Sequence, residues 1–476
     1  MNIRTVHLRN FRGFRDVKLE LKPLTVLLGS NSSGKSSFGH ALAAATHCQR
    51  LDPGAQRPTL TPRGNPNEWP VDLGTIYDLR THGQSGRVYI GLQTEVGWVE
   101  LGFGGWDPDD TGLVLSHISY PSSPGTTTAT PAPSEHGTEF NVKAQTATES
   151  INASQLPHVL SSISVHRTKE NENIWWDENE NQQAVVDLDG LILRSIQHTG
   201  RTFMPLRREA QDAIRSLLGG LTYLQPTRMR PSRSYKNDIG AWQRIGYAGE
   251  GTPALLQQEG DKPISFPDPA PIPHSMEQAK AVLGKNWEAR DSTLLGAVNV
   301  WLEKLGLASS VRPKYFEQDR RNLQISVSLP GQEPHDITEI GFGVSQVIPV
   351  LTAGLMQSEG SLFIVDLPEA HLHPWPQARL ADFFCSLALS GRSSLIETHS
   401  EMFFHQLRLR AEMYPALNKE IAVYFVDEPK DGECSPPRAI GLSSKGQLRW
   451  PAGFLAEAWD TEKHIKFIRE ARGGER

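Results

Sequence analysis

Cysteine is scarce in this sequence: only Cys48, Cys385 and Cys434 occur among its 476 residues. Their separations match no metal-ligand spacing, which excludes a disulfide framework and a cysteine-based zinc site. Apolar runs of the ~18–20 residues that cross a bilayer are also missing. The N-terminal segment MNIRTVHLRNFRGF has no apolar signal-peptide region. We therefore expect a soluble, cytoplasmic protein that does not associate with a membrane.

The chain also lacks an excess of positive charge. Its 48 Lys and Arg against 54 Asp and Glu give a formal net charge of −6. This balance disfavours a globally basic nucleic-acid binder but leaves a local basic patch open. Hydrophobic residues make up 38% of the chain, and 41 glycines bring the composition into the globular range, which excludes a disordered chain.

Strand and helix patterns alternate near both ends of the chain. Residues 24–28 (LTVLL) form a continuous apolar run, typical of a strand buried on both faces, and a helical pattern follows through 41–45. In the final third, a glycine turn runs into an apolar helix over 339–355. Further strands are expected at 361–366, 394–396 and 422–426. This alternation predicts a mostly parallel sheet that is covered on both faces.

Other segments carry weaker patterns. Short strands are expected at 3–8, 17–21, 87–92, 98–103, 312–317 and 323–329. Apolar residues at helical spacing predict helices over 206–218 and 294–305, the second capped by Asp291 or Ser292. The low-complexity stretch PSSPGTTTATPAPS (121–134) is predicted to be a mobile surface loop.

The segment Gly29–Ser36 (GSNSSGKS) matches the phosphate-binding pattern GxxxxGK[ST] without a mismatch. Its two glycines let the backbone curl so that N–H groups point at phosphate oxygens, and the helix that follows adds its N-terminal dipole. Lys35 is expected to reach the β- and γ-phosphates, and the Ser36 hydroxyl is expected to bind Mg²⁺. The expected nucleotide-binding residues of this loop are Gly29, Asn31, Ser32, Ser33, Gly34, Lys35, Ser36 and Ser37.

A P-loop also needs an acidic residue at the end of a neighbouring strand to hold Mg²⁺. Asp366 ends the apolar run SLFIVD, about 330 residues after the loop. This separation excludes small GTPases and simple kinases, whose site fits in one domain, and favours an ATPase with a long insertion. Glu369 lies three residues further on, and His399 ends the next strand in ETHS. We therefore expect ATP and Mg²⁺ as cofactors, with Ser36 and Asp366 as metal ligands and Glu369 and His399 as catalytic residues.

These motifs resemble those of the RecF/SMC-like ABC ATPases. The resemblance lies in LRNFRGF and TVLLGSNSSGKSS near the N-terminus and in PEAHLHP and ETHS near the other end. Within that superfamily the chain looks most similar to stand-alone ATPases of bacterial antiphage operons, such as the Septu and PARIS ATPase subunits. It also resembles the ATPase half of the OLD-family nucleases. The likeness covers roughly residues 1–105 and 222–456.

The resemblance implies an α/β P-loop NTPase fold with an ABC-type, RecF/SMC head-like mixed sheet, an N-terminal antiparallel β subdomain and a long α+β insertion. Four regions are predicted: an N-terminal ATPase lobe with the P-loop, a variable insertion with the Pro- and Thr-rich loop, a helical and β linker subdomain, and a C-terminal ATPase lobe with the remaining motifs. Their respective boundaries are 1–105, 106–221, 222–335 and 336–476.

The resemblance further implies a head-to-head homodimer that encloses two ATP molecules between the P-loop of one chain and a signature helix of the other. The matching stretch here is GFGVSQ, with Gly343 and Ser345 as the residues expected to meet the nucleotide. Because they precede a predicted helix, backbone N–H and hydroxyl donors could meet a γ-phosphate. The alternative is a plain helix cap at a glycine turn.

Leu367 departs from the ABC pattern, because the catalytic glutamate usually follows the Asp366 position directly. Leucine cannot orient water or accept a proton, so Glu369 is the nearest carboxylate for that role. The alternative is a slow or switch-like ATPase that mainly binds ATP. His371 and His373 have no third ligand nearby in the sequence, which favours packing and hydrogen bonding over a metal site.

Three arginines in the loop YLQPTRMRPSR, Arg228, Arg230 and Arg233, could bind phosphate, nucleic acid or a partner's acidic residues, or could be solvated. An OLD-type nuclease would need a second catalytic domain, and the acidic residues after His399 include no strand-terminal DxD. We therefore expect no nuclease activity from this chain alone, and a separate effector protein, such as a nuclease, as its partner.

The leading functional hypothesis is an ATP-hydrolysing ABC/RecF-like ATPase that dimerises around ATP and couples this to a partner effector in antiphage defence. One alternative is a DNA-clamping, repair-type ATPase, but the coiled-coil heptads that would favour it are missing. A transporter subunit is disfavoured by the long insertion and the missing LSGGQ motif. A non-hydrolysing, ATP-gated scaffold stays open because of Leu367.

Overall fold

The structure of the chain is a computed structural model. The described residues are 3–50, 73, 75–94, 97–103, 220–237, 245–282, 287–316, 319–430 and 432–442, together with strands between 115 and 203 whose backbone alone is described.

The backbone contacts divide the chain into two compact units, each assembled from distant segments of sequence. Unit 1 comprises Met1–Leu21, Ser36–Gln225 and Gln357–Ile364, and unit 2 comprises Lys22–Lys35, Pro226–Met356 and Val365–Arg476. The four regions predicted from the sequence stay a prediction.

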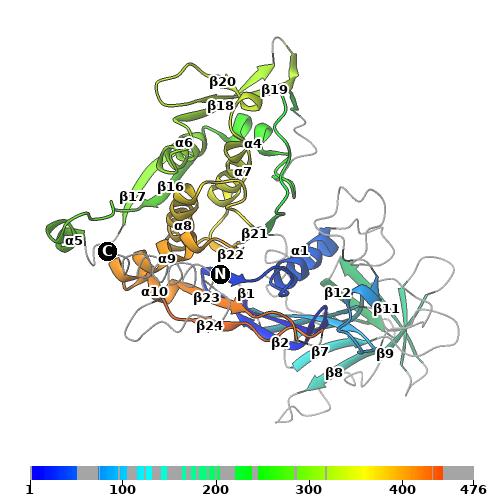
Figure 1. Cartoon of the computed structure of the whole chain (residues 1–476). Coiled ribbons are helices and arrows are strands. Elements are labelled where there is room, and N and C mark those ends of the chain that lie inside the picture. The colour runs from blue at the N-terminus through cyan, green and yellow to red at the C-terminus, as the bar shows by residue number, and fades with distance from the viewer. Residues whose placement is uncertain are drawn as a thin grey trace, which may run out of the picture. The chain divides into compact units, whose positions relative to one another are not determined.

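Unit 1 is built on a twelve-stranded antiparallel sheet with the order β13-β12-β11-β10-β9-β8-β7-β6-β5-β4-β1-β2 (Figure 1). Its N-terminal strands are β1 (Ile3–Phe11), β2 (Phe14–Glu20), β4 (Val88–Thr94) and β5 (Gly97–Phe103). In β2, the buried Val17 and Leu19 alternate with exposed charged residues, whereas β1 is buried throughout Thr5–Leu8. The N-terminal antiparallel β region predicted from the sequence is confirmed.

The insertion continues the same sheet. Its strands are β6 (Leu115–Ser122), β7 (Gly125–Thr130), β8 (Asn141–Thr146), β9 (Ile163–Arg167), β10 (Asn173–Asp177), β11 (Gln182–Asp189), β12 (Ile192–His198) and β13 (Arg201–Phe203). The predicted loop over 121–134 is therefore wrong for β7 and the end of β6, because consecutive threonines favour a strand once a neighbouring strand is available. Residues 131–134 and the helix expected at 206–218 lie outside the described residues.

A second sheet carries the P-loop and has the strand order β14-β21-β22-β3-β23-β24. Its strands are β14 (Leu221–Leu224), β21 (Leu362–Asp366), β22 (Ser393–Glu397), β3 (Leu24–Gly29), β23 (Ile421–Val426) and β24 (Arg438–Ile440). Strands β22 and β23 both run parallel to β3, so their carboxyl ends meet at one edge. Every residue of β3 is buried, as the unbroken apolar run predicts.

Helices follow the strands in the order that the sequence predicts. They are α1 (Ser36–Arg50), α6 (Leu294–Lys304), α7 (Phe342–Met356), α8 (Pro374–Leu389), α9 (Glu401–Met413) and α10 (Leu417–Glu420). Within unit 2, α6 contacts α7, and α8 packs on α9 and on β22 and β3 (Figure 1). No helix among the described residues is long and apolar enough to cross a membrane.

The cap of α6 differs from the prediction. Asp291 and Ser292 lie within the strand Glu288–Thr293, where they pair with Ser265 and Ile264, and the helix begins only at Leu294. Thr293 is the N-cap instead, and its hydroxyl accepts a hydrogen bond from the Gly296 amide at 3.1 Å.

Smaller elements complete the described chain. They are α2 (Ile76–Leu79), β15 (Tyr235–Lys236), α4 (Thr252–Glu259), β16 (Pro263–Asp268), α5 (Met276–Val282), β17 (Glu288–Thr293), β18 (Ser310–Phe316), β19 (Asp319–Ser328), β20 (His335–Asp336) and the 3₁₀ helix Ile337–Glu339.

Candidate nucleotide-binding site

The P-loop begins where β3 ends, and two glycines there adopt backbone conformations that other residues rarely reach. Gly29 has a φ of +147° and Gly34 a φ of +97°. A Cβ atom at Gly29 would also collide with the carbonyl oxygen of Val426 on β23. Only glycine fits at this position, so the tight turn that the motif requires is present.

Lys35 lies inside the loop, with its side chain 2% exposed. Its ammonium group donates hydrogen bonds to the Ser30 carbonyl and, at 3.2 Å, to the Ser33 hydroxyl. An acidic group, Glu397, lies beside it, with Oε1 3.9 Å from Lys35 Nζ. Burial lowers the pKa of Lys35, and the negative charge of Glu397 opposes that shift.

The other loop residues predicted to bind nucleotide divide by exposure. Asn31 and Ser32 are exposed, and Ser33 is buried. Ser36 is the first residue of α1, directly after Lys35, and Ser37 is buried within its first turn. The backbone N–H groups of such a helix start have no partner within the helix, which suits them to an anion.

Asp366 ends β21 with only 4% of its surface exposed. Arg228 packs directly behind it and donates hydrogen bonds to the Asp366 carbonyl at 2.8 Å and to the Leu367 carbonyl at 3.2 Å. Arg228 is 2% exposed. The possibility that this arginine is solvated is therefore wrong: it fixes the backbone that carries Asp366.

Leu367 has a φ of +47°, and its amide donates to the Glu397 carbonyl at 2.8 Å. A left-handed conformation is uncommon for a leucine, so the backbone turns sharply after Asp366. This turn continues into the segment that carries Glu369.

Glu369 is buried, at 7% exposure, and its Oε1 accepts a hydrogen bond from the His399 amide at 2.9 Å. Its other oxygen, Oε2, is buried and has no hydrogen-bond partner in the part of the chain that the structure describes. Burial raises the pKa of Glu369, and hydrogen bonds from the Thr398 hydroxyl and the His399 amide work against that shift. A carboxylate with one fixed and one open oxygen is suited to accept a proton from water.

His399 connects Glu369 to the P-loop. Its backbone amide binds Glu369, and its Nδ1 lies 3.0 Å from the carbonyl oxygen of Gly29. Because a carbonyl only accepts hydrogen bonds, Nδ1 carries the proton and Nε2 is left as an acceptor. Burial is the main cause that lowers the pKa of His399, and the charge of Lys35 lowers it further, so the ring is neutral near pH 7.

The signature stretch lies at the start of α7, which begins at Phe342. A Cβ atom at Gly343 would lie 2.7 Å from the His371 carbonyl, so this glycine permits close approach between the helix and the loop after β21. The Ser345 hydroxyl donates to the Phe342 carbonyl at 2.7 Å, within its own helix. Phe342 is 39% exposed and contacts the His371 ring edge-on, with ring centroids 4.8 Å apart.

His371 and His373 lie in the loop that follows β21. Both are exposed, and the described residues contain no cluster of three or more His, Cys, Asp or Glu side chains. Mg²⁺ does not need such a cluster, because it binds one or two protein oxygens together with phosphate oxygens and waters. The hydroxyl of Ser36 and the carboxylate of Asp366 are oxygen donors of the kind that Mg²⁺ prefers.

Two buried residues of this site were not identified as functional from the sequence. Glu397 ends β22 and lies beside Lys35, and its place in ETHS was the available signal. Arg228 was considered only as one of three loop arginines, because its contacts with Asp366 and Leu367 lie 138 and 139 residues away in sequence. No local pattern encodes such a contact.

Strand β3, which runs parallel to β22 and β23, ends in this glycine loop, and the chain has a P-loop ATPase fold with mixed α/β sheets. Two family models match parts of the chain. The first, AAA ATPase domain, matches residues 1–45. The second, AAA domain, putative AbiEii toxin, Type IV TA system, matches residues 274–404. Both models describe AAA domains, the first over the P-loop and the second over the segment that carries Asp366, Glu369 and His399.

Among solved structures, the chain is similar to SMC head domains. The head from Thermotoga maritima is 10% identical with a TM-score of 0.34, covering 92% of this chain and 99% of that one. An Smc head with an extended coiled coil, bound to the C-terminal domain of ScpA derived from Pyrococcus furiosus, is 12% identical with a TM-score of 0.39, covering 99% of this chain and 100% of that one. No curated protein matches the chain.

Proposed function

We propose that this chain binds ATP together with Mg²⁺ and hydrolyses it. The observation that carries the proposal is the position of His399. This residue hydrogen-bonds the candidate base Glu369 through its amide and the Gly29 carbonyl, at the start of the phosphate loop, through its ring. Two parallel strands, β3 and β22, end at this point and fix its geometry.

The loop residues would hold the phosphates. Backbone N–H groups of the glycine turn would bind phosphate oxygens, and a phosphate oxygen could replace the Ser30 carbonyl as the acceptor of Lys35. Ser36 and Asp366 would hold the metal, which supplies charge neutralisation of the phosphates when it is bound.

Glu369 would position and deprotonate the attacking water through Oε2, and His399 would present Nε2 toward the γ-phosphate or the water. The raised pKa of Glu369 favours proton acceptance near neutral pH. A second candidate, a non-hydrolysing ATP-gated scaffold, is favoured by Leu367, which replaces the usual carboxylate next to Asp366.

Phosphate release by the purified protein with Mg²⁺ and ATP tests this function. The wild type is expected to release phosphate, and Lys35→Ala is expected to lose both release and ATP binding. Lys314→Ala, an exposed lysine on β18, is the matched control and should behave as wild type. Retention of both activities by Lys35→Ala would refute the P-loop proposal, whereas ATP binding without release by the wild type would favour the scaffold.

We further propose that ATP binding drives homodimerisation through the start of α7, with Gly343 and Ser345 facing the partner's nucleotide. Support comes from the exposed Phe342 at the first position of the helix, whereas Ser345 is 7% exposed and would have to be reached from that surface. Ser345→Arg is expected to abolish ATP-dependent dimerisation, measured by light scattering. Normal dimerisation of this variant would contradict the assignment.

The partner of such an ATPase would be a separate effector, such as a nuclease, in antiphage defence. The motif resemblance to antiphage ATPases supports this role, as does the second family model, whose description names a putative toxin of a toxin–antitoxin system. Co-purification of the chain with the product of an adjacent gene, in the presence and absence of ATP, tests the coupling.

A further inference from the structure

A cavity of about 600 Å³ lies within unit 2, away from the P-loop motifs. It is formed by the extended segment 269–274 and by side chains from α5, α6, α8 and α9. This volume lies within the range of ~300–1,000 Å³ that is typical of small-molecule sites. Its lining includes three cationic side chains, Lys304, Arg379 and Arg410, and one carboxylate, Asp382.

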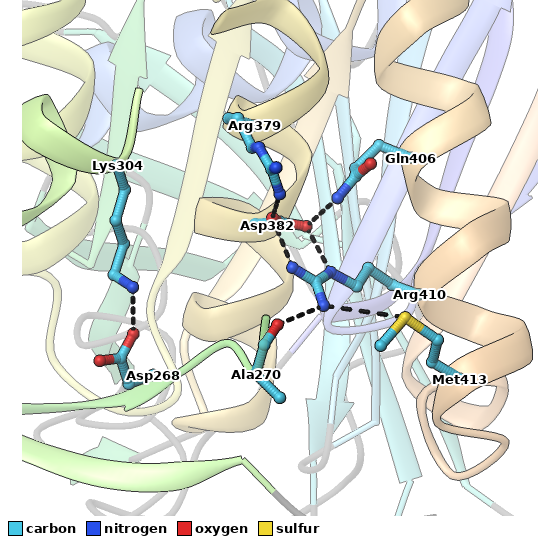
Figure 2. Close-up of polar contacts among 8 residues, drawn as sticks. All are labelled: Asp268, Ala270, Lys304, Arg379, Asp382, Gln406, Arg410 and Met413. Carbon is cyan, nitrogen blue, oxygen red and sulfur yellow. Dashed lines mark hydrogen bonds and ion pairs between the residues drawn. The ribbon is translucent and has the colours of Figure 1, made fainter. Parts of the chain in front are cut away.

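Two residues that line the cavity, Arg410 and Asp382, belong to a buried polar cluster. Arg410 binds Asp382 through two hydrogen bonds, Nε to Oδ1 at 2.7 Å and Nη2 to Oδ2 at 2.8 Å, and it also donates to the Ala270 carbonyl (Figure 2). Gln406 donates to the same carboxylate at 2.8 Å. Arg410 is 1% exposed as a side chain. Its role is therefore to hold α8 and α9 together rather than to meet a ligand.

Lys304 and Arg379 differ from Arg410, because both reach solvent. Lys304 is 30% exposed and makes an ion pair with Asp268 at 2.7 Å, and Arg379 is 27% exposed and lies 3.4 Å from Asp382 (Figure 2). If Arg379 turned toward a ligand, Asp382 would still be paired with Arg410. Such partly exposed ion pairs contribute little to stability, so both cations can exchange their partners for a ligand anion.

An apolar wall adjoins these cations. It includes three prolines of the segment 269–273 and the ring of Trp375, which is 53% exposed. The Arg379 guanidinium lies 5.2 Å from the centre of that ring. A flat ring against the proline and tryptophan wall would place an attached anion within reach of Lys304 and Arg379.

We propose that this cavity is a second ligand site, separate from the P-loop, that binds a small aromatic anion of the size of a mononucleotide. Lys304 and Arg379 bind the anionic group, and Trp375 and the proline wall contact the ring. The site does not depend on ATP hydrolysis, so its test can succeed or fail independently of the proposed function.

Isothermal titration calorimetry with AMP, GMP, CMP and UMP tests the proposal in the full chain carrying Lys35→Ala, so that any signal does not come from the P-loop. At least one monophosphate is expected to bind at millimolar concentration or below. The double variant Lys304→Ala, Arg379→Ala is expected to weaken that binding at least about tenfold, the effect of losing one hydrogen bond to a charged group. Trp375→Ala should also weaken it, and Lys314→Ala should leave it unchanged.

Two further ligands test the contributions of the ring and of the anionic group to binding. The matching nucleoside and inorganic phosphate should each bind more weakly than the monophosphate. Thermal unfolding identifies any variant that fails to fold, and Trp375→Ala, exposed at its surface, provides an independent route if the double variant fails. Binding by none of the four monophosphates, equal binding by inorganic phosphate alone, or unchanged binding in folded double and Trp375→Ala variants would overturn the proposal.

Discussion

Two buried ion pairs in unit 2 differ in how completely they are satisfied. In the cluster between α8 and α9, Arg410 and Asp382 are joined by two hydrogen bonds of 2.7 and 2.8 Å, and Gln406 supplies a third to the carboxylate. In the P-loop, Lys35 and Glu397 are 3.9 Å apart, and Lys35 otherwise binds oxygens of its own loop.

The difference separates a structural pair from a functional one. A buried charge pair offsets its desolvation only when geometry and additional hydrogen bonds are good, as at Arg410 and Asp382. Lys35 lacks such a partner, so its charged form is disfavoured by burial and would be stabilised by an incoming phosphate. Glu369 is also incompletely hydrogen-bonded, because its buried Oε2 has no partner among the described residues.

Loss of the carboxylate from the closed cluster is expected to have the largest effect on stability. Asp382→Ala should lower the free energy of unfolding by about 3–5 kcal/mol, because it leaves the buried guanidinium of Arg410 without its charged partner. Urea unfolding followed by circular dichroism measures this loss.

Glu397, which lies 3.9 Å from Lys35, provides the internal comparison, and its replacement by Gln should cost clearly less than Asp382→Ala because Lys35 keeps its hydrogen bonds to Ser30 and Ser33. Glu259→Ala, which removes a surface pair with Lys262, is the external control and should change stability by less than about 1 kcal/mol. Equal losses at Asp382 and Glu397 would remove the distinction between the two pairs.

Glu369 should make stability depend on pH in a defined direction. Its pKa is raised in the folded state, so it binds more protons there than in the unfolded chain and contributes stability that is fully present below 4.5 and lost as pH rises through the folded pKa. Glu369→Gln removes this contribution. The stability of the variant relative to wild type should therefore increase as pH rises, by about 1.4 kcal/mol for each unit by which the pKa is raised.

Unfolding of both proteins between about pH 5 and 8 checks this dependence. Glu333→Gln, which changes an exposed carboxylate in the loop after β19, is the control variant for the same measurement. A difference between wild type and Glu369→Gln that stays constant or shrinks with rising pH would contradict the burial of an unsatisfied carboxylate.

The smallest expected effect concerns α6, the helix that brings Lys304 to the second cavity. Thr293→Ala should cost about 0.5–2 kcal/mol, because the Gly296 amide loses its cap. Asp291→Ala and Ser292→Ala, at the two positions favoured by the sequence, should each cost less. A larger loss at either of them would show that the cap is not at Thr293.

The sequence predicted the P-loop sheet well because each of its parts has a local signal. Unbroken apolar runs identified β3, β21 and β23, and the glycine and lysine spacing identified the loop between β3 and α1. The fold class is confirmed for the same reason. The threonine-rich strand β7 was missed because low-complexity composition gives no periodic signal, and its pairing with neighbouring strands stabilises it.

Contacts between distant segments could not be predicted in this way. Arg228 reaches Asp366 across 138 residues, and Asp382 binds Arg410 across 28 residues on two different helices. Charged residues are usually solvated, so neither of these contacts can be recognised in a single sequence. The cap of α6 was misplaced by one or two residues because pairing with β16 extends β17 as far as Thr293, and no local pattern reveals that pairing.

The central claim is that the incompletely satisfied carboxylate of Glu369 is the base for ATP hydrolysis. Its most direct test compares phosphate release at saturating ATP by wild type, Glu369→Gln and the control Glu333→Gln, with ATP binding measured on each. We predict that Glu369→Gln binds ATP normally but releases phosphate about 10²–10⁴-fold more slowly, while Glu333→Gln matches wild type. Wild-type release by Glu369→Gln would contradict the account.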